Sequence, residues 1–159
     1  MQLRKPKLTD DVYRQKNGYP KLLSFPQLGD RRGELIAIEG NADIPFHIKR
    51  VFYIYGSDAA LVRGKHANKK SEFVMISVSG KCKIDVADGL GYKESFDLDC
   101  PHTGVYLPRL IWKEMYGFSK DCILLVLASE HYSASEYLHD YDIFLNEITQ
   151  AKLNRPDDE

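Results

Sequence analysis

The sequence has little of what marks secreted, membrane-bound or thiolate-metal proteins. It contains three cysteines, Cys82, Cys100 and Cys122, and no two of them form a C-x-x-C pair. Because the count is odd and the spacings are wide, the cysteines argue against both a disulfide framework and a zinc knuckle. Cys82 and Cys122 lie in strand-like runs, where we expect them to be buried thiols.

Long hydrophobic runs and an excess of charge are also missing. No apolar run approaches the roughly 18 residues that a membrane span needs, and the basic residues near the N-terminus are not followed by the apolar region of a secretory signal. We therefore expect a cytoplasmic protein with no membrane partner. The formal net charge of −1 gives no global basic field, which argues against nucleic-acid binding. An anionic ligand would have to be held by local cations.

What the chain does contain is the pattern of many short β-strands. Its 159 residues fit one domain. Apolar residues recur with period two or in short dense runs bounded by Gly, Pro, Asn and Asp, which is typical of strands. These runs cover residues 33–40, 48–56, 71–80, 82–89, 92–99, 103–108, 112–118 and 122–129. With no long helix between them, they predict an all-β, antiparallel barrel of the jelly-roll kind.

The domain organisation follows from the same pattern. We expect an N-terminal extension over residues 1–20, a barrel over 21–132, a helix over 133–151 and a polar tail over 152–159. Ser133 or Ser135 would cap this helix. Its apolar stripe consists of Tyr137, Leu138, Tyr141, Phe144, Leu145 and Ile148.

The stretch RGKHANKKSEFVMISVSG, residues 63–80, comes close to the first metal-binding motif of cupin barrels, G-(x)5-H-x-H-(x)3,4-E-(x)6-G. His66 and Glu72 occupy ligand positions, but Asn68 stands at the second histidine, and one extra residue precedes the glycine. The region of the second motif, residues 106–115, has no histidine. One imidazole and one carboxylate are too few ligands for a catalytic divalent ion. We therefore predict no metal and no other cofactor.

Ionisable residues are concentrated before and along this otherwise apolar strand. They are Arg63, Lys65, His66, Lys69, Lys70 and Glu72. Burying them unpaired would cost several kcal/mol, so some of them are expected to face a wet cavity. A charged barrel mouth indicates a ligand site.

Several motifs resemble one known family in order and in spacing. They are D-x-R-G, K-R-V-x-Y, R-G-x-H-A, L-x-x-x-I-W-x-E-M and L-V-L-A-S-x-x-Y, found within residues 30–56, 62–89 and 104–132, and the block SEYLHDYDIF, residues 135–144, belongs to the same resemblance. The chain is similar here to the sugar nucleotide 3,4-ketoisomerases, the WxcM-like cupins that act on dTDP-4-keto-6-deoxyglucose. The resemblance covers roughly residues 20–145. It implies a metal-free, RmlC-like jelly-roll homodimer that supplies keto sugars for 3-amino-3,6-dideoxyhexoses of surface polysaccharides such as the O-antigen of lipopolysaccharide.

The resemblance also implies a catalytic base. The family pattern R-G-x-H-A-H-K carries over to His66 at its first histidine, whereas Asn68 replaces the second. Asparagine exchanges no proton near neutral pH, although it donates and accepts hydrogen bonds. Asn68 therefore marks either a subgroup with one shuttling histidine or a histidine replacement that holds substrate unreacted.

The chemistry needs a base and a second polar group. A neutral imidazole can take the proton from carbon 3 of a 4-keto sugar and return it to carbon 4 through an enediolate, which is the role predicted for His66. Tyr53, Asn68 or a water molecule is the candidate for the proton transfer between the two oxygens. Arg50 and Tyr53 are expected to stabilise the negative charge on oxygen.

Other residues are assigned to substrate binding. Arg63, with its planar donors, and Lys69, as a point charge, are expected to hold the diphosphate. Glu72 and Lys113 are predicted to lie near the substrate, and Trp112 either to line the pocket or to belong to the core.

Three alternatives stay open. A dTDP-keto-sugar 3,5-epimerase would need a His-Asp dyad, and no aspartate follows His66 at a suitable position. A cupin that binds a dTDP-sugar without catalysis is favoured by Asn68, and a metal-dependent oxygenase is the third. The configuration produced at carbon 4, galacto or gluco, is not encoded in any motif of the sequence.

Overall fold

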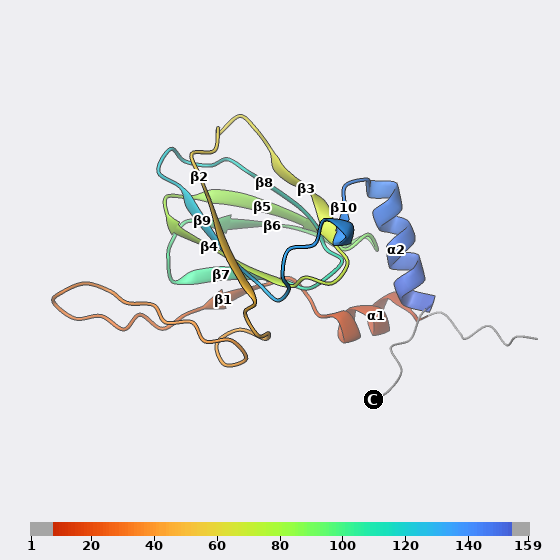
Figure 1. The fold of residues 1–159 in the computed structure, drawn as a ribbon, viewed down its shortest axis with the longest axis horizontal. Coiled ribbons are helices and arrows are strands. Elements are labelled where there is room, and N and C mark those ends of the chain that lie inside the picture. The colour runs from red at the N-terminus through yellow and green to blue at the C-terminus, as the bar shows by residue number, and fades with distance from the viewer. Residues whose placement is uncertain (1–7, 154–159) are drawn as a thin grey trace, which may run out of the picture.

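The computed structural model describes residues 8–153, which form two antiparallel sheets packed face to face (Figure 1). The first sheet has the order β1 (Lys21–Ser24), β7 (Thr103–Leu107), β4 (Phe73–Ser79), β9 (Ile123–Ala128) and β2 (Arg50–Tyr55). The second has the order β10 (Tyr137–Leu138), β3 (Arg63–Asn68), β8 (Trp112–Tyr116), β5 (Cys82–Ala87) and β6 (Lys93–Leu98). The predicted all-β jelly-roll class is confirmed, with the strands in two separate sheets.

The core lies between the two sheets because each strand sends alternate side chains inward. In β4, Phe73 and Met75 face the second sheet, whereas Val74 and Ile76 belong to a different cluster on the outer face. The fully buried side chains of the inner cluster include Ile84, Leu98, Val105, Leu107, Leu124 and Val126. Each contributes about 1.5–3 kcal/mol to folding. Cys82 and Cys122 are buried free thiols of this core, as expected.

An arm formed by residues 25–48 projects from the end of β1 beyond the sheets (Figure 1). Its base covers the outer face of the first sheet, where Phe25, Ile44 and Phe46 pack on β4 and its neighbours. The strand expected over residues 33–40 does not form. Only isolated bridges occur there, because this stretch has no continuous neighbouring strand within residues 8–153.

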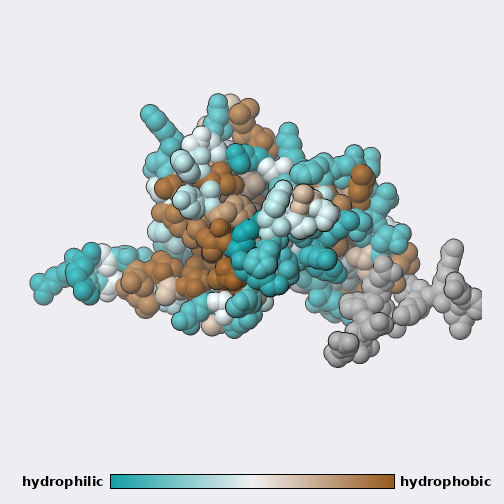
Figure 2. Space-filling view, in the orientation of Figure 1, coloured by the Kyte–Doolittle hydropathy of each residue, from teal (hydrophilic) through white to brown (hydrophobic). Residues whose placement is uncertain are grey.

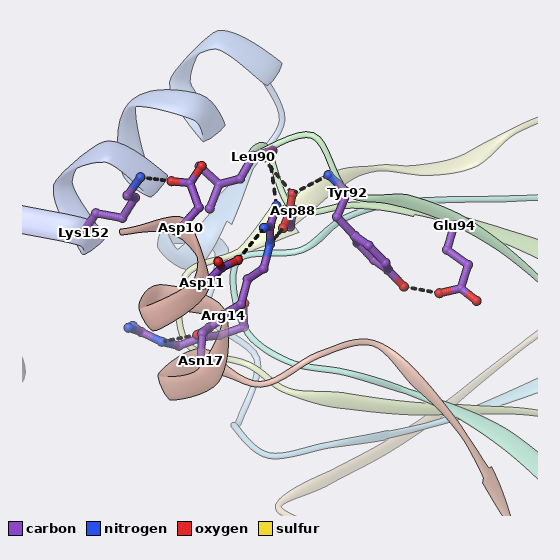
Figure 3. A network of polar contacts seen from close by, with 10 residues as sticks. Asp10, Asp11, Arg14, Asn17, Asp88, Leu90, Tyr92, Glu94 and Lys152 are labelled. Carbon is purple, nitrogen blue, oxygen red and sulfur yellow. Dashed lines mark hydrogen bonds and ion pairs between the residues drawn. The ribbon is translucent and has the colours of Figure 1, made fainter. Parts of the chain in front are cut away.

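The N-terminal extension contains a helix that the sequence analysis did not identify, α1 (Asp10–Asn17), capped by Thr9. Figure 3 shows how it is attached. The Arg14 Nε atom donates to Asp88 at 2.6 Å, and its Nη2 atom donates to the Leu90 carbonyl at 2.9 Å. Asp88 is 4% exposed and also accepts two backbone N–H groups of its own hairpin. The helix is therefore held to the β5–β6 hairpin by a buried carboxylate.

The C-terminal helix begins later than predicted. Helix α2 spans Tyr141–Leu153, and Asp140 caps it by accepting the N–H of Ile143 at 3.0 Å. Residues 134–138, predicted as helix, form a 3-10 turn and strand β10. The reason is that Glu136 within this turn is buried and hydrogen-bonded to the loop after β3, which a helix from residue 133 would not allow. Residues 152 and 153 of the expected tail continue the helix, and the rest of the tail lies outside the described residues.

No helix within residues 8–153 is long and apolar enough to cross a membrane.

We expect Arg14→Ala to lower the free energy of unfolding by about 1–3 kcal/mol, because it leaves a buried carboxylate without its charged partner. Urea denaturation measures the change. Gln15→Ala, on the exposed side of the same helix, is the matched control and should stay within about 0.5 kcal/mol of the wild type. Equal effects of the two substitutions would show that the Arg14 contact contributes nothing.

Candidate active site

A cavity of about 140 Å³ opens between the sheets, bordered by β2, β3, β4, β8 and β9 and by Tyr137 of β10. Its lining is mostly apolar, with a few ionisable groups. The lining residues are Phe52, Ile54, Arg63, Gly64, His66, Phe73, Met75, Lys113, Met115, Val126 and Tyr137. Pockets for whole drug-sized ligands measure about 300–1,000 Å³, so the cavity fits one small ring rather than an entire sugar nucleotide.

A β-bulge in β3 aims His66 into this cavity. The register with β8 shifts between Gly64 and His66, and both Gly64 and Lys65 have positive φ, 86° and 55°. A Cβ atom on Gly64 would lie 2.8 Å from the Lys113 carbonyl oxygen, so only glycine fits there. After the bulge, His66 pairs directly with Lys113. Residues paired in this way put their side chains on the same face of a sheet.

Lys113 belongs to a buried hydrogen-bonded network. Its Nζ atom donates to Asn68 Oδ1 at 2.8 Å, and Asn68 Nδ2 donates to Glu136 Oε1 at 3.2 Å. Lys113, Asn68 and Glu136 are 3%, 1% and 5% exposed. The Glu136 carboxylate also accepts the backbone N–H groups of Lys70 and Ser71, both at 3.0 Å, and the Ser71 hydroxyl. Lys113 and Glu136, which carry opposite charges, are thus both buried, with the amide of Asn68 between them.

The pKa values in the network shift in ways that burial and neighbours explain. Burial alone would raise the pKa of Glu136, but hydrogen bonds from Ser71, Asn68 and Lys70 hold it below its ordinary value. Burial lowers the pKa of Lys113 to about 7, and the negative charge of Glu136 opposes this shift. The ammonium also lies 4.7 Å from the ring centre of Phe73. Lys113 can therefore gain and lose a proton near neutral pH.

His66 is neutral at the same pH. Burial, followed by the positive charge of Lys113, lowers the pKa of His66 to about 4. Its ring lies 5.0 Å from Tyr137 and 5.6 Å from His139, centre to centre. These two rings stack on one another at 5.9 Å. The aromatic group holds a neutral, base-competent imidazole at the edge of the cavity.

Arg50 approaches the same rim from β2. Its guanidinium lies over the rings of Phe52 and Tyr132, at 4.9 and 5.5 Å, and its Nη2 atom donates to the Tyr137 hydroxyl at 3.4 Å. The Nε atom is buried and has no hydrogen-bond partner among residues 8–153. The predicted place of Arg50 beside the site agrees with this geometry.

Tyr53 does not lie where its predicted catalytic role requires. Arg50, Phe52 and Ile54 face inward along β2, so Tyr53 between them points to the outer face and is 63% exposed. Alternation along a strand makes this unavoidable. Within one chain, Tyr53 cannot act together with His66.

Three predicted substrate-binding residues also lie outside the His66 cavity. Trp112 packs against Tyr141 and Phe144 of α2 and lines a separate groove. Glu72 accepts from the Tyr106 hydroxyl at 2.5 Å and lines another pocket. Lys69 lies 3.6 Å from Glu147 of α2 in an ion pair.

Arg63 and Lys113, the other two cations assigned to substrate binding, do line the His66 cavity. Arg63 is exposed, so it can meet a charged ligand group at the entrance.

Within residues 8–153, no group of three His, Cys, Asp or Glu side chains could hold a metal ion. The two residues that match the cupin metal motif, His66 and Glu72, line different hollows and do not converge. Residues 106–115, the region of the second motif, contain no histidine that could join either of them as a ligand.

Four residues of the site were missed from the sequence. The sequence analysis places Tyr137 in a helix stripe and gives His139, Glu136 and Ser71 no role in the site. Three of them lie within residues 133–151, where the apolar spacing predicts a helix. Glu136 follows a serine in the predicted helix, and nothing in the neighbouring sequence indicates that its side chain is buried next to β3.

A jelly roll of this size, with a histidine facing its cavity from the strand that carries the R-G-x-H motif, defines a cupin-type protein. The family model named FdtA and described as WxcM-like, C-terminal, matches residues 19–149. The chain therefore belongs to the FdtA/WxcM-like family.

Two similar proteins are named for a 3,4-isomerase activity. The chain is 41% identical over 135 residues to the TDP-4-oxo-6-deoxy-alpha-D-glucose-3,4-oxoisomerase of Aneurinibacillus thermoaerophilus, covering 85% of this chain and 96% of the relative. A 3,4-ketoisomerase from Helicobacter canadensis is 43% identical, with a TM-score of 0.78 over 81% of this chain and 96% of that one.

A third similar protein was crystallised with a sugar nucleotide. It is a His-to-Asn mutant of the 3,4-ketoisomerase QdtA from Thermoanaerobacterium thermosaccharolyticum, in complex with TDP-4-keto-6-deoxyglucose. It is 38% identical, with a TM-score of 0.79 over 82% of this chain and 94% of that one.

The stability of the fold should fall as the pH is lowered from about 6.5 to about 4. The unfolded chain protonates His66 near its ordinary pKa of about 6.5, whereas the folded chain does so only near 4. Between these values the unfolded state binds more protons, so acid favours it, by about 1–3 kcal/mol in total. Urea unfolding across this range measures the slope.

His66→Gln should flatten the slope. His47→Gln, which changes an exposed histidine before β2, should leave it unchanged. A slope that persists in His66→Gln would assign it to another group.

Proposed function

We propose that this protein is a TDP-sugar 3,4-ketoisomerase that converts TDP-4-keto-6-deoxyglucose to the 3-keto isomer. The observation that carries the proposal is a neutral imidazole, His66, paired across two strands with a buried lysine in a cavity the size of a sugar ring. Relatives named for this reaction support it. The cytoplasmic location expected from the sequence, and a role in making 3-amino-3,6-dideoxyhexoses for surface polysaccharides, are parts of the same proposal.

His66 is the base. The carbonyl at carbon 4 acidifies the hydrogen on carbon 3, and removing that hydrogen gives an enediolate. A neutral imidazole is needed for this step, and the depressed pKa of His66 keeps it neutral at physiological pH. The hydroxyl proton on the carbon-3 oxygen passes to the carbon-4 oxygen, and the imidazolium returns its proton to carbon 4, which leaves the ketone on carbon 3. No redox partner is consumed, because hydrogen only changes place within the sugar.

The positive charges around the cavity suit the rest of the substrate. Lys113 in the cavity can stabilise negative charge on the sugar oxygens. Arg63 at the entrance is exposed and offers the planar donors that phosphate oxygens prefer. Since the cavity fits only one ring, we place the sugar inside it and the diphosphate at Arg63.

We also propose that two chains form a homodimer through the outer face of the first sheet. Val51, Tyr53 and Tyr55 on β2 are 55%, 63% and 71% exposed, and Leu28 and Leu35 of the arm are 60% and 55% exposed. Figure 2 shows hydrophobic residues gathered where the arm leaves the sheets. The arm has strand-like alternation without a continuous partner strand in the described part of its own chain, residues 8–153. A second copy would cover both features, since large exposed apolar patches mark interfaces.

We expect His66→Ala to lower kcat at least about 10²-fold, the usual loss of a general base, while TDP affinity changes little because Arg63 is untouched. Conversion of TDP-4-keto-6-deoxyglucose is followed by NMR and TDP binding by calorimetry. His47→Ala is the matched control and should retain activity. Turnover by His66→Ala close to that of the wild type would show that another group is the base.

A wild-type chain that binds TDP, but neither makes product nor exchanges the carbon-3 hydrogen in heavy water, would be a sugar-nucleotide-binding protein instead. The replacement of the family's second histidine by Asn68 is the observation that favours this alternative.

We expect the wild type to elute with the mass of two chains in size-exclusion chromatography with light scattering. The double variant Tyr53→Asp, Tyr55→Asp should elute as a monomer, because two charges on the apolar face oppose its burial. Lys93→Asp, on β6 of the other sheet, should remain dimeric. A monomeric wild type, or a dimeric double variant, contradicts the proposed interface.

A further inference from the structure

We propose that Lys113, held in place by Asn68, carries the proton between the two sugar oxygens while His66 moves the hydrogen between the two carbons. This inference rests on the proposed ketoisomerase function. It assigns the second proton-transfer step, which a single histidine leaves open.

The reaction requires two proton movements. Hydrogen leaves carbon 3 and arrives at carbon 4, and a second proton leaves the oxygen on carbon 3 and arrives at the oxygen on carbon 4. The group that performs the second movement must donate a proton, accept one, and finish as it began. It must also reach both oxygens from one side of the ring.

Few groups of the described cavity meet these conditions. Asn68 exchanges no proton, and Arg63 stays protonated. Tyr53 is on the outer face of β2. Besides His66, this leaves Lys113 and the Tyr137 hydroxyl, which already accepts from Arg50 at the rim.

Lys113 is the better placed of the two. Its backbone pairs directly with that of His66, so both side chains enter the cavity from neighbouring strands on one face. Lys113 is 3% exposed, and within residues 8–153 its amine has one hydrogen-bonded partner, Asn68 Oδ1 at 2.8 Å. An ammonium has three N–H donors, so two remain for sugar oxygens.

Asn68 acts as a positioning residue for this amine. Glu136 accepts hydrogen bonds only, so the amide nitrogen of Asn68 must face it, and the amide oxygen is then fixed toward Lys113. The acceptor offered to Lys113 is neutral. A carboxylate at that place would hold the proton on the amine, whereas an amide lets the proton leave. The asparagine that departs from the family pattern therefore fits a lysine that must deprotonate.

The steps balance. As His66 removes the carbon-3 hydrogen, the Lys113 ammonium gives a proton to the oxygen on carbon 4, and an enediol forms. The neutral amine then takes the proton from the oxygen on carbon 3 while the imidazolium gives its proton to carbon 4. The ketone is now on carbon 3, and both side chains have regained their starting protonation.

The surroundings of Lys113 permit this exchange. His66 and Arg63 from β3 and Tyr137 from β10 line the cavity together with Lys113, and Glu136 lies on the other side of Asn68. Burial lowers the pKa of Lys113 to about 7 in this setting, so both of its forms are present in neutral solution. Values of kcat/KM should therefore fall above about pH 7, as the ammonium is lost, and below about pH 4, as His66 becomes protonated.

The test compares four variants for conversion of TDP-4-keto-6-deoxyglucose and for TDP binding. Lys113→Met removes the amine at similar size, and Lys113→Arg keeps a charge that does not leave. Tyr137→Phe removes the competing hydroxyl, and Lys83→Met changes an exposed lysine of β5 as the control. We expect both Lys113 variants to lose at least about 10²-fold in kcat with TDP affinity retained. Tyr137→Phe should lose much less, and Lys83→Met should match the wild type.

Each outcome bears on the assignment. If Lys113→Arg keeps more than a tenth of the wild-type kcat, charge alone suffices and the proton-carrying role is wrong. If Tyr137→Phe loses activity and Lys113→Met does not, the role belongs to Tyr137. If Lys113→Met also loses TDP binding, its effect is structural, and Lys113→Arg decides. A wild type that makes no 3-keto product overturns the proposed function itself.

The electrostatic coupling between Lys113 and His66 can be measured without turnover. In an NMR titration of His66, Lys113→Met should raise the midpoint, because the positive neighbour that depresses it is gone. An unchanged midpoint would show that the two side chains are not coupled.

Asn68→Leu tests the positioning role. Without the amide oxygen the ammonium loses its hydrogen-bonded partner, so the alkaline limb of kcat/KM should move to lower pH. Asn68→Leu with an unshifted limb would mean that Asn68 does not hold Lys113.

Discussion

The site depends on one buried charge placed opposite a histidine. Lys113 is nearly inaccessible to water, yet its only full counter-charge in the network is Glu136, on the far side of the Asn68 amide. A buried ammonium without a direct carboxylate partner is costly. The cost appears as the lowered pKa of Lys113 and, through its charge, as part of the lowered pKa of His66. In weakly acidic solution an ordinary lysine and an ordinary histidine would both be charged. Here His66 stays neutral and can accept a proton, and Lys113 can both give and take a proton near neutral pH.

The rest of the fold supports this pair. The glycine of the R-G-x-H motif lets β3 bulge against the Lys113 carbonyl, and the bulge turns His66 inward. The turn before β10 brings Glu136 under Asn68 and places Tyr137 against the imidazole. Gly64 of the motif and the late start of α2 therefore both contribute to the arrangement of His66, Lys113 and Asn68. A helix from residue 133 would have removed the carboxylate that orients the amide.

The sequence predicted the fold better than the site. Alternation located most strands because each strand has one face in the core, and His66, Arg50, Arg63 and Lys113 could be placed near one cavity from motif and alternation. Tyr53 was misplaced because it lies three positions after Arg50 on the same strand, so alternation turns the two side chains to opposite faces of the sheet. Glu136 was missed because its burial depends on contacts with residues 65 positions or more away in the chain. Such contacts leave no periodic signal.

The unfilled hydrogen-bonding capacity of Lys113 also bears on selectivity. Only one of its N–H groups is taken by Asn68, and the ring of Phe73 on another side offers no lone pair. If a bound sugar lacked oxygen at either of two adjacent carbons, one N–H group of Lys113 would be buried without a hydrogen-bond acceptor. Sites built to satisfy a substrate hydroxyl reject analogues without it by factors of roughly 10⁴–10⁵. In its proposed role, Lys113 would therefore select sugars that carry oxygen on both of the adjacent carbons before any bond is broken.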